Sequence, residues 1–269
     1  MKKIAKALRA LRLIAANPYL LNAVLNNESV KKKEVMEKYG LSQGLPVVDL
    51  ETIFPDFEQQ VSPYSYLSGM TLPIDLALLK ALAQKYQVQS YFEIGTWRGE
   101  SVANVASVVP QCTTFNLSKE EILALGGPQE YASLHGFFSE KLPNVTQLWG
   151  NSQTFDFSEH YGRYDLVFVD GDHHPEAVKK DTETAFKLLR NEQAIIVWHD
   201  YGSDTETVRW SVLSGILDGT LAEKRGHLYH VANTMCAIYL PQEVMSHPLV
   251  PYEKPHRYFD IDIKLQEIK

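Results

Sequence analysis

Two short stretches of this 269-residue chain carry acids and imidazoles side by side. Residues 170–174 read DGDHH after an apolar run, and residues 198–201 read WHDY at the end of another. Carboxylates and imidazoles that leave a buried strand together repel or desolvate one another unless a proton, a cation or a substrate organises them. The two stretches therefore predict an acid–base or cation-binding centre, and a purely structural role is the minority interpretation.

A glycine turn provides a second kind of site. Residues 91–101 read YFEIGTWRGES, an apolar run that ends in an acid, followed by Gly95, Gly99 and a helical pattern. Glycine lets the backbone turn sharply and approach a ligand, and a helix that opens at Gly99 presents free N–H groups to it. The turn predicts a site for a small, partly anionic molecule. It lacks the three glycines of the dinucleotide fingerprint, which lowers the rank of nicotinamide cofactors.

The elements that must position these residues alternate as in a parallel α/β sheet. We expect strands at 91–94, 112–117, 145–149, 166–169 and 194–198, helices at 102–109 and 178–189, helical material at 120–135, and a closing hairpin from 227–231 and 235–240. Ser203 and Glu206 form a predicted capping box for a helix that continues to Ile216. In open sheets of this kind, ligands bind beyond the carboxyl ends of the strands, where both acidic stretches lie.

The N-terminal region is predicted to form two amphipathic helices. Ile4, Leu8 and Leu11 follow helical spacing with Lys and Arg opposite, and Asn17-Pro18 supplies a cap and first turn for a second helix over 20–25. These apolar stripes require a partner: the main domain, a second copy in a homodimer, or, less favoured, a membrane surface. Residues 41–73 are rich in Pro and Gly and suit an irregular lid. The predicted division is 1–72 as extension and lid, 73–242 as the main domain, and 243–269 as a tail.

Composition bounds the class of protein. A hydrophobic content of 45% with 22% charged residues suits one large α/β core. Cys112 and Cys236 lie in apolar runs, which indicates a reducing compartment without a disulfide framework or zinc site. No apolar stretch approaches the ~20 residues of a membrane span, and polar residues interrupt the N-terminal run as a signal peptide, so we expect a cytoplasmic protein without membrane insertion.

Charge is distributed unevenly along the chain. Residues 1–40 carry nine Lys or Arg against three Glu, a sum of +6, so in a chain of net charge −7 the remainder carries −13. An acidic main body argues against a nucleic-acid partner, because neutralising phosphates requires clustered Lys and Arg on the active face.

The glycine turn resembles the first motif of class I S-adenosylmethionine (SAM)-dependent methyltransferases. The DGDH and WHDY stretches resemble matching segments of the macrocin O-methyltransferase-like branch of that family. The resemblance implies a Rossmann-like seven-stranded sheet, mostly parallel with the last strand antiparallel. It also implies SAM as cofactor and O-methylation of a small-molecule or sugar-type acceptor.

The resemblance assigns residues to the cofactor. Asn116 stands where the family usually has an acid for the ribose hydroxyls, and Asn can accept through one oxygen only. Asn151 is placed where relatives meet the adenine amino group. The full predicted set is Met70, Thr71, Glu93, Gly95, Thr96, Trp97, Gly99, Ser101, Asn116, Leu117, Asn151, Ser152, Asp170 and Asp172.

The predicted catalytic residues are Asp170, His173 and His199. In metal-assisted relatives the two strand ends bind Mg²⁺, and Asp170 and Asp200 match those positions. His199 stands where some relatives have another acid, and nitrogen is a poor magnesium ligand. Without a metal, His173 or His199 would act as general base. Four aromatic residues are expected around the pocket, namely Tyr64, Tyr66, Trp97 and Tyr201.

Two other functions compete with methyl transfer. Asp170-Gly171-Asp172 satisfies the loose D-x-D pattern of metal-dependent nucleotide-sugar glycosyltransferases, although no basic group for a diphosphate lies nearby in the sequence. A non-catalytic relative that keeps the fold and binds the cofactor is the second alternative, with Asn116 and His199 as marks of lost chemistry.

Overall fold

A single mixed sheet organises the protein, whose computed structural model describes residues 2–69 and 71–267. The strand order is β1-β7-β8-β6-β5-β2-β3-β4, and β8 alone runs antiparallel to its neighbours β6 and β7 among the pairs described. The strands are β1 (Val47–Val48), β2 (Ser90–Ile94), β3 (Gln111–Asn116), β4 (Val145–Trp149), β5 (Leu166–Val169), β6 (Ile195–Trp198), β7 (Leu228–Val231) and β8 (Ala237–Tyr239). This arrangement confirms the predicted Rossmann-like methyltransferase sheet.

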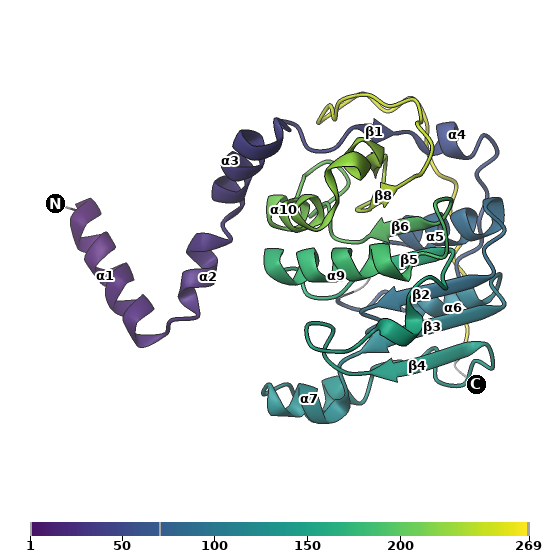
Figure 1. The fold of residues 1–269 in the computed structure, drawn as a ribbon, viewed down its shortest axis with the longest axis horizontal. Helices are drawn as coiled ribbons and strands as arrows, with labels where there is room; N and C mark the ends of the chain where they lie inside the picture. Colours follow the sequence, from purple (N-terminus) through teal and green to yellow (C-terminus); the bar gives the residue numbers. More distant parts are fainter. Residues whose placement is uncertain (1, 70, 268–269) are drawn as a thin grey trace.

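Helices cover both faces of the sheet (Figure 1). Side chains of β5 alternate between two cores: Val167 and Val169 pack with α9 (Pro175–Leu188) and α10 (Trp210–Gly219), whereas Leu166 and Phe168 pack with α5 (Pro73–Lys85) and α6 (Glu100–Ala106). A strand buried on both faces is apolar at every position, which is why this run was readable in the sequence. Two short helices, α7 (Lys119–Ala124) and α8 (Gln129–Ala132), precede β4.

The sheet has one strand more than the seven expected. Val47 pairs with His230 and Val48 with Val231, which places β1 at the edge beside β7. These residues come from the segment predicted to be irregular, between the N-terminal helices and α4 (Leu50–Ile53). A two-residue strand is too short to show any alternation of polar and apolar residues.

The predicted capping box at Ser203 and Glu206 is wrong. Ser203 closes a turn by donating its N–H to the Thr207 carbonyl, and α10 begins only at Trp210. Its first N–H groups are bonded by Glu28, whose carboxylate accepts from the N–H of Trp210 and from the N–H and hydroxyl of Ser211. A cap supplied from 182 residues away cannot be read from local sequence.

The N-terminal helices differ from the prediction in number and start. The structure has α1 (Lys2–Ala16), α2 (Leu20–Leu25) and an unpredicted α3 (Glu28–Tyr39). Tyr19 occupies the N-cap of α2 instead of Asn17. Figure 1 shows α1 and α2 extending away from the sheet, whereas α3 packs on α10. Within residues 2–69 and 71–267, we find no helix of sufficient length and apolar character to span a bilayer.

Candidate functional site

The glycine turn and the acidic end of β5 meet at the centre of the sheet. Strand β2 pairs with β3 on one side and with β5 on the other, so the chain connections diverge at its carboxyl end. Gly95 follows β2 with φ of +87°, and a Cβ atom there would lie 2.0 Å from the Asp170 carbonyl oxygen. Position 95 therefore requires glycine for both its backbone conformation and its contact with the next strand end.

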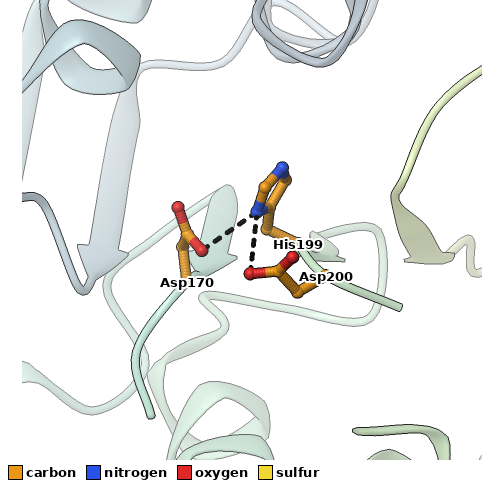
Figure 2. A group of neighbouring side chains, drawn as sticks. All are labelled: Asp170, His199 and Asp200. Carbon is orange, nitrogen blue, oxygen red and sulfur yellow. Dashed lines mark hydrogen bonds and ion pairs between the residues drawn. The ribbon is translucent and has the colours of Figure 1, made fainter. Parts of the chain in front are cut away.

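His199 joins three carboxylates at this edge. Its Nδ1 lies 3.1 Å from Asp170 Oδ1 and 3.4 Å from Asp200 Oδ2, as Figure 2 shows, and its Nε2 lies 3.2 Å from Asp75 Oδ2. Burial alone would lower the pKa of His199. The charge of Asp170 and the hydrogen bonds to the surrounding carboxylates outweigh burial and raise that pKa well above its ordinary value. His199 is therefore an imidazolium that holds the acids together.

Asp200 lies against three nitrogen-bearing side chains, those of His199, His173 and Arg209. Its Oδ2 also lies 3.0 Å from His173 Nε2, and its Oδ1 lies 3.2 Å from Arg209 Nη1. Burial would raise the pKa of Asp200, but the hydrogen bond and charge of His199, with the charges of His173 and Arg209, lower it to about 2. Asp200 has φ of +56°, a backbone conformation that is uncommon outside glycine and is often found at functional sites.

The third carboxylate, Asp75, was not predicted as a site residue. It is fully buried in the first turn of α5, where Oδ1 accepts the Met235 N–H at 3.0 Å and Oδ2 accepts the Leu72 N–H at 3.1 Å. An acid just after Pro73 is typical of a helix N-terminus, so its local pattern has a sufficient structural explanation. Its contact with His199 spans 124 residues of sequence.

Polar atoms without partners surround the glycine turn. Among the described residues, Thr96 Oγ1, Trp97 Nε1, Ser65 Oγ and Asn116 Nδ2 are buried and make no hydrogen bond. Asn116 Oδ1 accepts the Thr96 N–H at 2.8 Å, whereas the amide donor of Asn116 has no partner among the described residues. Buried polar groups are normally bonded, so these atoms indicate a bound molecule or ordered water at this turn.

Gly99 was expected to leave room for a ligand, but protein atoms fill the space beside it. It is the N-cap of α6, as predicted, with φ of +85°, but a Cβ atom there would lie 2.5 Å from Ser139 Oγ. The segment 136–139 is fixed against the turn because Gly136 donates to the Trp97 carbonyl and Phe138 to the Arg98 carbonyl. The small size of Gly99 therefore serves protein packing.

Trp97 and Glu93 are held by protein on the same turn. The Trp97 ring lies 4.0 Å from that of Tyr131 and 5.3 Å from that of His135, measured between centroids. Glu93 is fully buried and accepts the hydroxyls of Tyr91 and Ser101. Burial raises the pKa of Glu93 to about 7. The hydrogen bond between Ser101 and Glu93 thus connects α6 to β2 next to the turn.

The loops after β3, β4 and β5 place the remaining predicted cofactor residues. Leu117 is half-buried beside Ser118, which caps α7. Asn151 Oδ1 accepts the Gln153 N–H, and the side chain of Gln153 donates to Ser152 Oγ and to Asp181 Oδ1. Asp172 pairs with His174 at 2.5 Å and makes no ion pair with His199 in the described structure.

Asp181 on α9 is a second buried carboxyl that sequence reasoning missed. Its Oδ2 has no partner among the described residues. Burial raises the pKa of Asp181 to about 7.

The segment 62–69 covers the start of α6, as expected of a lid. Glu100 accepts the Ser65 N–H at 2.7 Å, and Asn104 accepts the Ser62 N–H at 2.8 Å. Tyr64 and Tyr66 pack edge to face within it, and burial raises the pKa of Tyr64 to about 12.

The other residues predicted near the lid and pocket have different outcomes. Thr71 is half-buried just before α5, and Met70 lies outside the described residues. Tyr201 is fully buried and bonds the Leu45 N–H, so it belongs to the core and not to a pocket.

The largest surface depression that we describe is not at this site. It encloses about 610 Å³, lies open to solvent, and is lined by residues 204–208, Trp210 and Tyr252, among others. We assign the site from the convergence of strand ends and unpaired polar atoms, because size alone does not identify a functional pocket.

Mg²⁺ does not fit the acidic cluster in this arrangement. Ligand atoms of Asp170, His199 and Asp200 lie within 4.8 Å of one another, a spacing that suits a metal. However, His199 Nδ1 hydrogen-bonds Asp170, and the two oxygens of Asp200 already form ion pairs with His173 and Arg209. A magnesium ion, which prefers oxygen ligands, would have to displace these nitrogen groups.

Two solved structures are similar to part of this chain. The O-methyltransferase TomG from Streptomyces achromogenes, solved with SAM, is 20% identical, covering 64% of this chain and 81% of its own, with a TM-score of 0.45. An O-methyltransferase from Bacillus cereus, solved with SAH, is 18% identical, covering 83% and 95%, with a TM-score of 0.44. No curated protein matches the chain.

A family match covers the site itself. Residues 92–201 match the family described as "Methyltransferase domain", a stretch that includes the glycine turn and both acidic strand ends. The match confirms the predicted class of enzyme, a methyltransferase.

Proposed function

We propose that the protein transfers the methyl group of SAM to a hydroxyl oxygen of a small-molecule or sugar-type acceptor. One observation carries the proposal: unpaired polar atoms line the Gly95 turn, and the same turn touches the strand end that bears Asp170. A donor held at the turn would lie next to the acid–imidazole cluster. The family match over residues 92–201 supports the same reaction class.

The turn offers groups that suit the polar parts of SAM. Thr96 Oγ1 can donate or accept, and Asn116 Nδ2 can donate to a ribose oxygen. Because Asn116 Oδ1 is occupied by Thr96, we propose that Asn116 acts toward the ribose as a donor, which differs from the acceptor role of the usual acid. The other predicted cofactor residues, Asn151 and Ser152 among them, remain predictions.

His173 is the general base that the geometry favours. Its ring is about half exposed and its Nε2 lies 3.0 Å from Asp200 Oδ2, so the tautomer with its hydrogen on Nε2 presents the Nδ1 lone pair to an acceptor. His199 is less suitable because all its ring N–H groups point at carboxylates. An Asp-oriented imidazole that faces an acceptor is the usual arrangement for proton removal from a hydroxyl.

Beyond proton removal, the reaction requires the acceptor oxygen to be held in line with the bond between the methyl group and the sulfur of SAM. SAM supplies an electrophilic methyl group on a positively charged sulfur. The acceptor oxygen forms the new C–O bond as the C–S bond breaks, the sulfur keeps the bonding pair, and His173 Nδ1 takes the hydroxyl proton. Holding the reactants in line and excluding water supplies much of the rate enhancement in reactions of this type. The contacts of Ser62 and Ser65 with α6 support a part of the predicted lid, residues 41–73, in excluding water.

Two finer points are part of the proposal. The DGDH and WHDY stretches support membership of the macrocin O-methyltransferase-like branch. We propose that transfer by this chain does not require a divalent cation, because His199 and Arg209 already pair with the carboxylates that would bind it. The proposed acceptor is a small molecule or glycan that carries a hydroxyl group.

Cofactor binding followed by transfer tests the function. We expect S-adenosylhomocysteine to bind in calorimetry and to raise the melting temperature, and methyl from labelled SAM to appear on members of a phenol, polyol and sugar panel, with or without EDTA. A shift with uridine diphosphate and Mn²⁺ and none with S-adenosylhomocysteine would support the glycosyltransferase. Tight cofactor binding without any product would support the non-catalytic relative.

A further inference from the structure

The first two helices form a separate arm. Helices α1 and α2, here called the N-terminal arm (residues 2–27), contact each other and stand away from the sheet (Figure 1). The next helix, α3, is anchored to α10 by Glu28 at Ser211 and by the ion pair of Lys38 with Asp218. The arm therefore leaves the body at a fixed point and is not part of its core.

The arm exposes large apolar side chains. In α1, Ile4 is 68% exposed and Leu11 62% exposed, and Leu8 is also more than half exposed. These three residues follow the i, i+4, i+7 spacing that places them on one face of a helix. The second helix adds Leu20, Leu21, Val24 and Leu25, all exposed. Exposed apolar side chains gathered on one short segment indicate a binding surface.

The polar face of α1 carries one sign of charge. Lys6 and Arg9 lie opposite Leu11, while Lys3 and Arg12 flank the apolar face on its two sides. Residues 2–27 contain five Lys or Arg and no Asp or Glu, so the arm carries +5 and, in a chain of −7, the rest carries −12. Basic residues on both borders of an apolar face are typical of helices that lie in a lipid interface, where the cations reach phosphate groups.

The same charges disfavour pairing of two arms. A symmetric contact between copies would place the same face of each helix against the other, with five cations from each and no acid to neutralise them. Like charges held within a Debye length repel. An anionic surface offers both an apolar layer and counter-charges without that cost.

We propose that the N-terminal arm binds an anionic lipid surface. Ile4, Leu8 and Leu11 enter the boundary between headgroups and acyl chains, and the Lys and Arg side chains of α1 contact lipid phosphates. The body remains in water beside the membrane, because its acidic surface is repelled by the same lipids. This inference does not depend on the methyl-transfer chemistry.

Flotation of the full-length protein with vesicles tests the proposal. We expect binding to phosphatidylcholine vesicles that contain phosphatidylglycerol, weak binding to pure phosphatidylcholine, and release by added sodium chloride. Lys3→Gln combined with Arg12→Gln should weaken binding by roughly thirtyfold. Because the arm lies outside the core, these variants should keep the melting temperature of the wild type.

A matched pair separates the apolar face from charge. Leu11→Glu and Ala10→Glu each add one negative charge to exposed positions of α1, and Ala10 lies on the polar side. Both should weaken binding about fivefold through charge. Leu11→Glu should weaken it by roughly a further tenfold, because it also removes an apolar contact.

Three results would overturn the proposal. One is failure of the wild-type protein to bind the anionic vesicles at low salt. Another is equal binding by the Leu11→Glu and Ala10→Glu variants. The third is a wild-type protein that forms a dimer in light scattering and does not bind vesicles, with a Leu11→Glu variant that is monomeric. That result would show that the arm binds a second copy of the chain.

Discussion

His173 Nε2 lies 3.0 Å from Asp200 Oδ2, whereas the adjacent His174 bonds Asp172. Two neighbouring imidazoles thus have different partners: one belongs to the acidic cluster that includes His199, and the other closes a turn before α9. Because both rings are about half exposed and are next to each other in sequence, they form a natural pair for testing which one removes a proton.

Replacing His173 should slow methyl transfer without loss of cofactor. Glutamine can still donate to Asp200 but cannot take a proton at neutral pH, so we expect His173→Gln to lower kcat by about 10²–10⁴. Affinity for S-adenosylhomocysteine, measured by calorimetry, should not change. His174→Gln is the control and should retain kcat within about threefold. If the two variants are equally slow, His173 is not the base.

Alanine at position 95 should damage the fold and the site together. A Cβ atom there meets the Asp170 carbonyl oxygen, whereas at Gly126, with φ of +85°, no described atom lies within 4 Å. Gly126→Ala should lower the free energy of unfolding by about 1 kcal/mol through backbone strain alone. Gly95→Ala should cost roughly 2 kcal/mol more, as measured by urea unfolding. Equal costs at both positions would mean that the strand ends move apart easily.

Thr96→Val should weaken cofactor binding but not the free protein. The Thr96 hydroxyl has no partner within the described structure, so its loss should leave the melting temperature of the free protein unchanged. If the hydroxyl bonds the ligand, the Kd of S-adenosylhomocysteine should rise roughly fivefold. Thr113 lies on β3, and its hydroxyl accepts a hydrogen bond from Tyr164. Thr113→Val removes that hydroxyl and should not change this Kd. An unchanged Kd for Thr96→Val would place the ligand elsewhere.

Stability should fall with rising pH because of Asp181. Burial raises its pKa from the ordinary 3.8 to about 7, so between these two pH values the folded state holds a proton that the unfolded state has lost. Unfolding therefore releases this proton, and by linkage the free energy of unfolding decreases as pH rises through that window.

Asp181→Asn tests this effect. Asparagine keeps an oxygen for Gln153 and cannot ionise, so the variant should match the wild type at pH 5 and exceed it at pH 8 by roughly 3 kcal/mol in denaturant unfolding. Glu93, whose pKa is also about 7, contributes the same trend to both proteins and cancels in the comparison. A variant that is less stable than the wild type at pH 8 would contradict the burial argument.

The strands and the chemistry at their ends could be predicted because both depend on local sequence. Residues 166–169 were predicted as a strand and form β5, since apolar runs buried on both faces are continuous in sequence. The positions of Asp170, His199 and Gly95 followed from these strands, because the carboxyl ends of parallel strands share one edge.

The remaining site residues depend on contacts that no local pattern records. Asp75 reaches His199 from the start of α5, and Arg209 reaches Asp200 from the loop before α10. Each has a sufficient local interpretation, as a helix-start acid or a solvated base, which conceals its role. The sequence predicted that Gly99 leaves room for a ligand, but Ser139, 40 residues later in the chain, fills the space beside it. No local pattern records that contact.

The carboxylate of Glu28 connects the N-terminal region to the start of α10, next to the candidate site. Arg209, which neutralises Asp200, directly precedes the backbone groups at Trp210 and Ser211 that Glu28 holds. A shortened protein that starts after residue 28 would lose this carboxylate, expose the beginning of α10 and loosen Arg209 beside Asp200. Removing the N-terminal residues is therefore expected to disturb the candidate site even though they lie outside it.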